Sequence, residues 1–244
     1  MFRLVLVVLV VVPATLWYGL RVLWHAYRGT PPGAEIFREA PRRWSRLILR
    51  VSGVKVVFEN ASVIDAGRPQ ILVANHVSWF DVLALSGHLP GRWVFVAKRE
   101  LADVPLFGRA AAACGQIFID RQDRNAAIQS LEAARRRLEE ERPTVIMFPE
   151  GTRSPDGNLQ PFKKGAFVLA IQSGVEIVPA AISGSRDVMP KGSLRIRPGT
   201  ITVRFGRPID VEGLGAEDRN NLTERAWHAL AALQQKQPTL NEPA

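Results

Sequence analysis

The chain has 244 residues, of which 47% are hydrophobic and 23% are charged. These proportions are those of a folded protein and exclude intrinsic disorder as the main theme. The length accommodates one large α/β domain, or one domain with an appendage. The net charge is +9 and Cys114 is the only cysteine, so no intrachain disulfide forms. We therefore expect the folded part to work in a reducing compartment.

The positive charge is concentrated near the amino terminus. Residues 1–50 contain eight arginines against two glutamates, which gives +6 and leaves +3 for the other 194 residues. A basic excess suits nucleic acid or an anionic membrane. We find no aromatic ribonucleoprotein motif, zinc-finger spacing or helix-turn-helix pattern, so we expect no nucleic acid partner. The apolar segment beside the arginines favours an anionic membrane surface.

That apolar segment is Leu4–Leu20, seventeen residues without a charge. As a helix it would reach about 25 Å, against a hydrocarbon core of about 30 Å. Trp17, Tyr18 and Trp24 suit the aromatic belt of a membrane interface. Pro13 would kink the helix, so a single span, a tilted span and a segment buried in one leaflet all remain open. We take residues 1–27 as a hydrophobic, membrane-anchoring segment.

The arginines also predict an orientation. Arg3 alone precedes the apolar segment, and seven arginines lie in the thirty residues after it. The positive-inside rule then places the rest of the chain on the cytoplasmic side of an inner or plasma membrane.

Residues 28–53 form the next region. Arg28–Pro41 is rich in proline and glycine and is typical of a linker. In Arg42–Val51, four apolar residues fall at helical spacing while four arginines can reach a polar side. We expect a basic amphipathic helix that lies on the membrane surface. The alternative is that the same apolar face docks on the protein core.

From Val54 onward, short apolar runs alternate with helical patterns. We expect strands at Val54–Phe58, Ile71–Ala74, Trp93–Ala97, Gln116–Ile119, Val145–Phe148, Glu176–Ile182, Ser193–Ile196 and Thr200–Phe205. We expect helices at Ser78–Gly87, Pro105–Ala113, Arg124–Glu140, Gly165–Ser173 and Ala216–Gln235. Such alternation predicts an α/β fold, with a mostly parallel mixed sheet covered by helices, over residues 54–236. Residues 237–244 are expected to form a frayed tail.

One stretch suggests a catalytic pair. Asn75–Asp81, with the sequence NHVSWFD, follows an apolar run and precedes a helical pattern. His76 and Asp81 are five residues apart and do not meet on a regular helix. They can meet across a turn, because Ser78 is a good N-cap and Asp81 takes the capping-box position. The imidazole would then keep one nitrogen free as a base. The alternative is a helix cap beside an ordinary loop histidine.

A second stretch suggests an anion site. Phe148–Ser154, with the sequence FPEGTRS, ends a predicted strand. Gly151 permits a tight turn, and Thr152 and Arg153 offer a hydroxyl and a guanidinium to an anion. Glu150 would orient the arginine or bind a substrate hydroxyl. The alternative is a strand exit with a surface ion pair.

Two further stretches follow the same layout less fully. Gly115–Arg121, with the sequence GQIFIDR, ends a strand in Asp120 and Arg121, although Asp120 or Asp123 could instead cap the following helix. Val178–Ile182, with the sequence VPAAI, is apolar, and we expect it to line a pocket.

Ligands of open α/β sheets bind at the carboxyl ends of the strands, so we expect His76, Arg121 and Arg153 at one rim. One base and two arginines suggest a nucleophile activated beside a phosphate. The sequence contains no G-x-S-x-G elbow and no Walker A motif. The other three histidines show no metal spacing, and we expect no catalytic metal.

The four stretches, in this order, resemble the 1-acyl-sn-glycerol-3-phosphate acyltransferase (lysophosphatidic acid acyltransferase) family of membrane glycerolipid acyltransferases. NHVSWFD is similar to the H-x4-D block of that family, GQIFIDR to its second block, FPEGTRS to its third and VPAAI to its fourth. AKREL, at Ala97–Leu101, resembles a lysine-bearing stretch between the first two blocks, and FKKG, at Phe162–Gly165, resembles a basic segment after the third. The resemblance implies a glycerol-3-phosphate acyltransferase-like fold and makes residues 54–236 the catalytic domain.

The resemblance also implies roles. His76 would be the general base and Asp81 its orienter, and Arg153 would hold a phosphate. The acceptor-binding positions would be Glu150, Gly151, Thr152 and Arg153, with Arg121 and Lys98 as further candidates for the same phosphate.

The implied reaction moves a fatty acyl group from acyl-CoA or acyl carrier protein to the sn-2 hydroxyl of 1-acyl-sn-glycerol 3-phosphate. Its product is phosphatidic acid, in phospholipid biosynthesis. The thioester is a co-substrate, and no cofactor is expected. Another acceptor remains an alternative: lyso-ornithine lipid, another lysophospholipid or glycerol 3-phosphate. A non-catalytic lipid-binding protein and a hydrolase of acyl thioesters are more distant alternatives.

Overall fold

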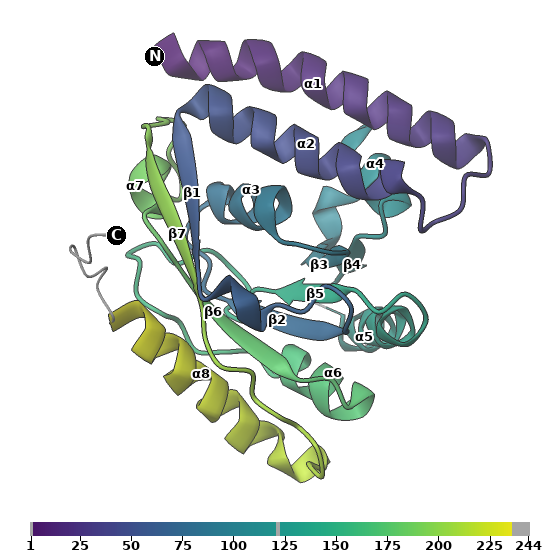
Figure 1. Ribbon diagram of the computed structural model, residues 1–244, viewed down its shortest axis with the longest axis vertical. Coiled ribbons are helices and arrows are strands. Elements are labelled where there is room, and N and C mark those ends of the chain that lie inside the picture. Colours follow the sequence, from purple (N-terminus) through teal and green to yellow (C-terminus); the bar gives the residue numbers. More distant parts are fainter. Residues whose placement is uncertain (1, 121–122, 236–244) are drawn as a thin grey trace.

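The computed structural model describes residues 2–120 and 123–235 (Figure 1). Its strands are β1 (Val54–Glu59), β2 (Gln70–Ala74), β3 (Trp93–Lys98), β4 (Ile117–Ile119), β5 (Thr144–Met147), β6 (Ile177–Ser183) and β7 (Gly199–Phe205). Its α-helices are α1 (Phe2–Tyr27), α2 (Glu35–Ser52), α3 (Trp79–His88), α4 (Phe107–Ala113), α5 (Arg124–Glu140), α6 (Gly165–Ser173), α7 (Ser185–Val188) and α8 (Arg219–Gln235).

The strands form one sheet in the order β1-β7-β6-β2-β5-β3-β4. Strands β6, β2, β5, β3 and β4 are parallel to their neighbours within this group. Strand β7 is antiparallel to β6 and parallel to β1, so these two strands run in the opposite direction. The predicted mixed, mostly parallel sheet is therefore confirmed. The carboxyl ends of β2, β5, β3 and β4 lie along one rim.

Helices cover both faces of this sheet. Every residue of β2 is buried, and successive side chains point to opposite faces. Ile71 and Val73 belong to the core that α5, α6 and α8 cover, whereas Leu72 and Ala74 belong to the core beneath α2 and α3. Figure 1 shows these two helical layers on either side of the strands. A strand buried on both faces needs a continuous apolar run, and β2 has one.

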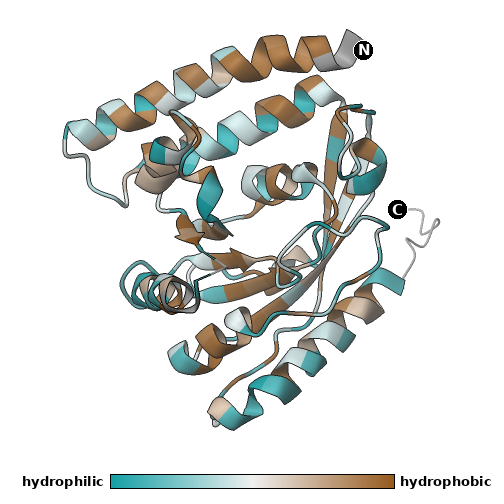
Figure 2. Cartoon of the chain, turned by 180° about the vertical axis from the view of Figure 1, so that it is seen from behind, coloured by the Kyte–Doolittle hydropathy of each residue, from teal (hydrophilic) through white to brown (hydrophobic). Residues whose placement is uncertain are grey.

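Helix α1 forms an outer layer against α2 and α4 (Figure 1). It continues through Pro13, and it is long and apolar enough to cross a membrane by length and composition. Trp44 of α2 donates a 2.9 Å hydrogen bond from Nε1 to Oγ1 of Thr15 on α1. Figure 2 shows α1 as mostly hydrophobic toward its amino-terminal end, with hydrophilic residues toward its carboxyl end. Its exposed large apolar residues are Val5, Leu6, Val8, Leu9, Val12, Leu16, Trp17, Leu20, Trp24 and Tyr27.

The predicted linker and amphipathic helix need correction. Helix α2 begins at Glu35, so the second half of the predicted linker Arg28–Pro41 is helical and Pro41 lies inside the helix. Phe37 and Ala40 are buried in a small core with Val22 of α1. This packing stabilises a helical turn that proline would otherwise weaken.

The expected membrane face of this helix also needs correction. The apolar side of α2 packs on α3: Ile48 and Leu49 are buried in the main core. Oγ of Ser45 lies 2.6 Å from Oγ of Ser86. The alternative stated above, in which the apolar face docks on the protein, is therefore the one observed.

One predicted strand was wrong. Residues 193–196 are a loop, because both sides of β7 are already occupied by β1 and β6. The remaining predicted strands are present, each with ends within one residue of those predicted. The predicted tail, residues 237–244, lies outside the described residues.

Candidate active site

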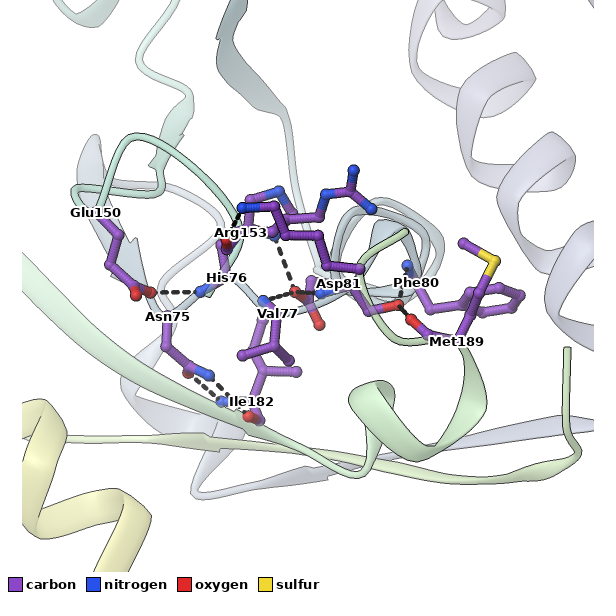
Figure 3. A network of polar contacts seen from close by, with 11 residues as sticks. Asn75, His76, Val77, Phe80, Asp81, Glu150, Arg153, Ile182 and Met189 are labelled. Atoms are coloured by element: carbon purple, nitrogen blue, oxygen red, sulfur yellow. Dashed lines mark hydrogen bonds and ion pairs between the residues drawn. The ribbon is translucent and has the colours of Figure 1, made fainter. Parts of the chain in front are cut away.

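The turn after β2 is anchored by Asn75. Its Nδ2 donates to the carbonyl oxygen of Ile182 at 2.9 Å, and its Oδ1 accepts from the backbone N–H of Ile182 at 2.7 Å (Figure 3). The Asn75 side chain is buried, and an amide offers the one donor and one acceptor that this strand end needs. The start of the NHVSWFD turn is therefore fixed to β6.

The same turn brings His76 and Asp81 together. Oδ2 of Asp81 lies 2.9 Å from Nδ1 of His76, and it also accepts the backbone N–H groups of Val77 at 2.7 Å and Ser78 at 2.8 Å. Ser78 is the N-cap of α3, and its Oγ accepts from the N–H of Phe80 at 3.2 Å. This is the capping box that the sequence predicts. The contact across the turn is present, and the Asp81 side chain is fully buried.

Two contacts orient the imidazole of His76: Asp81 bonds to its edge and Phe148 stacks on its face. Because a carboxylate only accepts, Nδ1 carries the proton and Nε2 keeps its lone pair. The ring stacks on Phe148, with centroids 4.1 Å apart and planes inclined by 16°. Phe148 stacks in turn on Phe95. The His76 side chain is 15% exposed, so an incoming group can reach it.

Glu150 lies beneath the main chain of His76. Its Oε1 accepts the N–H of His76 at 2.6 Å and its Oε2 accepts the N–H of Gln160 at 3.0 Å. The residue is 5% exposed. Burial raises the pKa of its carboxyl to about 7, against the lowering effect of the two N–H groups, and the charge of Asp81 adds to the rise.

Gly151 follows with a left-handed backbone, φ 77°. A Cβ built on it would lie 2.8 Å from Cε of Lys163. Glycine thus permits both the turn and the close approach of the lysine stem. Lys163 comes from the FKKG segment, so two basic stretches of the sequence meet at this loop.

Arg153 lies close to the turn that carries His76 and Asp81. Its Cζ is 5.0 Å from the ring centre of Trp79, the first residue of α3. Lys191 donates from Nζ to the backbone carbonyl of Arg153 at 2.8 Å. The loop of Arg153 meets the turn of His76 directly, because the N–H of Ser154 donates to the carbonyl oxygen of His76 at 2.8 Å (Figure 3). A planar cation on an aromatic face keeps its N–H groups available for an anion.

The other predicted positions are less closely joined to this centre. Lys98 ends β3 at the same rim, where its Nζ pairs with Glu100 at 2.6 Å and its side chain is 59% exposed. Thr152 is exposed. Arg121 lies outside the described residues. Asp123 caps α5, because its Oδ1 accepts the N–H of Ala126 at 3.2 Å. Within residues 2–120 and 123–235, no cluster of three metal-ligating side chains occurs.

Sequence reasoning missed three features of the site. Asn75 hydrogen-bonds the turn to β6, Phe148 stacks on the imidazole of His76, and Lys191 donates a hydrogen bond to the backbone of Arg153. Asn75 and Phe148 are the first residues of the motifs NHVSWFD and FPEGTRS, where their residue types alone indicate no role. Lys191 lies two residues before the segment Ser193–Ile196 that was predicted to be a strand, and no local pattern links it to Arg153.

Comparisons with known proteins agree with this architecture. Residues 55–183, more than half of the chain, match the family model described as Acyltransferase. The chain is 38% identical over 178 residues to a human protein named 1-acyl-sn-glycerol-3-phosphate acyltransferase alpha, covering 73% of this chain and 63% of that protein. It is 34% identical over 185 residues to a Cocos nucifera protein named 1-acyl-sn-glycerol-3-phosphate acyltransferase, covering 76% of this chain and 59% of that protein. The match thus spans less than two thirds of these relatives.

A solved structure is similar over nearly the whole chain. The crystal structure of the 1-acyl-sn-glycerophosphate (LPA) acyltransferase PlsC from Thermotoga maritima superposes with a TM-score of 0.78 at 25% identity, covering 98% of this chain and 97% of that one. The match extends beyond the sheet to the amino-terminal helices. The four motifs, the mixed sheet and these similarities lead to one conclusion: the chain belongs to the acyltransferase family.

Proposed function

We propose that this protein transfers a fatty acyl group from a thioester to the sn-2 hydroxyl of 1-acyl-sn-glycerol 3-phosphate. The observation that carries the proposal is the 2.9 Å contact between Nδ1 of His76 and Oδ2 of Asp81, close to Trp79, whose ring lies 5.0 Å from the guanidinium carbon of Arg153. The names of the human and Cocos nucifera relatives support the same acceptor.

His76 acts as the general base. Its Nε2 takes the proton of the acceptor hydroxyl while the oxygen attacks the thioester carbonyl carbon. The C–S bond then breaks, and the imidazolium returns the proton to the leaving thiolate. Asp81 holds the Nδ1 proton and stabilises the imidazolium. The substrate supplies the nucleophilic oxygen, so no acyl-enzyme forms.

Arg153 binds the phosphate of the acceptor. Its planar fork suits a phosphate, and Trp79 holds the guanidinium in place. Lys163 lies against Gly151 of the same loop and adds positive charge there. A phosphate held at this loop places the neighbouring glycerol hydroxyl over the turn that bears His76. Arg121 and Lys98 remain candidates for the same phosphate.

The donor is acyl-CoA or acyl carrier protein, and the product is phosphatidic acid for phospholipid biosynthesis. The lysolipid acceptor is a membrane lipid, and α1 exposes apolar side chains along most of its length. We place the protein on the inner or plasma membrane through α1, with the sheet on the cytoplasmic side. An anionic membrane surface meets the arginines that follow α1.

A panel of acceptors tests the proposed reaction. Purified protein in mixed micelles is given acyl-CoA or acyl carrier protein thioester with 1-acyl-sn-glycerol 3-phosphate, other lysophospholipids, lyso-ornithine lipid or glycerol 3-phosphate. Mass spectrometry of the products should show phosphatidic acid as the preferred diacyl product. Free fatty acid in its place indicates a thioester hydrolase, and unchanged substrates indicate a binding protein.

Two variants test the roles of the residues. His76→Ala should lower kcat by a factor of about 10² or more. Activity within a factor of about three of the unmodified protein rules out His76 as the base. Arg153→Ala should mainly raise KM for the phosphorylated acceptor. His228→Ala and Arg225→Ala are matched controls, because both side chains are exposed on α8, on the far side of the sheet.

A further inference from the structure

Within the described residues, the Glu150 side chain hydrogen-bonds only to main-chain groups. The sequence predicts that Glu150 orients Arg153 or binds a hydroxyl of the acceptor. In the structure its two carboxylate oxygens accept one N–H each, from His76 and Gln160. The residue is 5% exposed, which leaves little of the carboxylate open to a ligand. Its position therefore differs from that of a substrate-binding group.

The main chain of His76 is bonded on both sides to the loop that Glu150 begins. The N–H of His76 donates to Glu150 at 2.6 Å, and the carbonyl oxygen of His76 accepts from the N–H of Ser154 at 2.8 Å. Phe148, which precedes the loop, stacks on the imidazole. The segment from Phe148 to Ser154 thus contacts the N–H, the carbonyl and the ring of a single histidine.

The second carboxylate oxygen of Glu150 connects the start of this loop to the residues where the loop ends. Oε2 accepts the N–H of Gln160, ten residues further along the chain. The N–H of Lys163 also donates to the carbonyl of Pro149 at 2.8 Å. The loop is closed on itself by these two bonds. Glu150 therefore joins the fixed base of the Arg153 loop to the backbone that carries His76.

From this arrangement we infer that Glu150 is a positioning residue: its carboxylate bridges the backbone of His76 and the arginine loop, and it holds the imidazole at the distance from the phosphate site that acyl transfer needs. The inference rests on the proposed function and deepens it. It assigns Glu150 an indirect role and removes it from the set that touches the acceptor.

An ionised carboxylate is the group that this bridge requires. Each N–H needs an acceptor, and an ionised carboxylate provides two without a competing proton. Glutamine of the same length supplies one oxygen and one NH2 group, so one of the two N–H groups would face a donor. Aspartate keeps both oxygens but is shorter by one methylene, and it would not reach both partners at once.

The kinetic test compares Glu150→Gln, Glu150→Asp and Asp156→Asn in the acyl-transfer assay. Asp156 is a matched control because it lies in the same loop, is exposed, and bonds only within the turn around Ser154 and Asn158. Displacement of a base by about 1 Å lowers a rate by about 10²-fold. Both Glu150 variants should therefore lower kcat by about 10- to 100-fold with KM for the acceptor changed less than about twofold. Asp156→Asn should stay within about twofold of the unmodified protein.

Two kinetic outcomes overturn the inference. A raised KM for the acceptor with kcat unchanged would make Glu150 an acceptor-binding group. A kcat within about twofold of the unmodified protein would show that the bridge is dispensable. Absence of acyl transfer in the unmodified protein would instead defeat the proposed function, and a second measurement separates the two cases.

That measurement uses the unmodified protein and needs neither activity nor a variant that folds. The protein is labelled with ¹⁵N at histidine and glutamine, and the backbone amides of His76 and Gln160 are followed as the pH is lowered. If one carboxylate bridges both, the two amide signals shift together at the same pH. Gln160 lies away from the imidazole in the chain, so a Gln160 signal that does not shift would show that the bridge is absent and would overturn the inference.

Discussion

The imidazole of His76 lies flat on the phenyl ring of Phe148, with ring centroids 4.1 Å apart. These residues come from neighbouring strands: one follows β2 and the other follows β5. The stack supports the ring face while Asp81 bonds to its edge. The base is therefore held by Phe148, which follows β5, and by Asp81 of α3, and each contact can be tested by itself.

Replacing Phe148 with leucine should weaken the face contact. Leucine keeps an apolar side chain against Phe95 but offers no flat surface to the imidazole. We expect kcat to fall by about 10-fold, because the ring gains rotational freedom, with little change in KM for the acceptor. Steady-state kinetics measure this split. Phe148→Tyr, which keeps the ring, should retain most of the activity, and equal losses in both variants would contradict the stacking role.

Replacing Asp81 with asparagine should act on the tautomer of His76. Asparagine can turn an NH2 group toward Nδ1, which then accepts and leaves the proton on Nε2, where it blocks the base. We expect kcat to fall by about 10²- to 10⁴-fold. Thermal unfolding should also show a loss, since Oδ2 caps the first turn of α3. A variant with normal kcat would remove Asp81 from the mechanism.

The raised pKa of Glu150 predicts a pH-dependent stability. Its folded-state pKa of about 7 lies above the ordinary 4.5, so the neutral carboxyl stabilises the fold below pH 4.5 and this contribution is lost as the pH rises through 7. The charged group that acts on this carboxyl is Asp81, which adds to the rise in its pKa. Relative to Glu150→Gln, the unmodified protein should lose about 2 kcal/mol of unfolding free energy between pH 5 and pH 8.

Denaturant titrations of both proteins at several pH values check this difference, with Asp156→Asn as the control. A difference that stays constant with pH would show that Glu150 titrates at an ordinary value. The kinetic consequence has the opposite sign: protonation of Glu150 below pH 7 removes an acceptor from the bridge, so kcat of the unmodified protein should fall with decreasing pH. Above pH 7, the ionised carboxylate of Glu150 thus supports catalysis most and stabilises the fold least.

Replacing Gly151 with alanine should disturb the phosphate side of the site. The residue has φ 77°, and its Cβ would approach Cε of Lys163 at 2.8 Å. The backbone strain alone amounts to about 1–2 kcal/mol, and the lysine stem must move. We expect lower stability and a raised KM for the phosphorylated acceptor. Gly174→Ala also has a left-handed backbone but open space around it, so it should lose stability without changing KM.

Much of the architecture was readable because local patterns and tertiary packing agree. The capping box of Ser78 and Asp81 depends on a spacing of three residues, and the structure contains it. Helices α5 and α6 begin and end where their patterns do. The contact of His76 with Asp81 follows from that cap, so the sequence was sufficient to predict it.

The errors arise where partners decide the structure. Residues 193–196 have a strand-like composition, but β7 has no free edge for them. Residues 35–41 contain a proline that argues against a helix, and burial of Phe37 and Ala40 against α1 outweighs it. The two acceptor bonds of Glu150 come from residues 74 positions before it and ten positions after it. No local pattern in FPEGTRS indicates them.

The contact of α1 with the body of the protein has a mechanical consequence. Gly19 of α1 receives the side chain of Leu106, whose Cγ lies 3.0 Å from the Cβ that any other residue would carry. A helix joined by a flexible tether would let the sheet tumble beneath it. Helix α1 is instead packed on α2 and α4. A surface that binds the exposed side of α1 therefore also sets the tilt and height of the sheet rim. The rim that carries His76 then keeps one fixed angle to that surface.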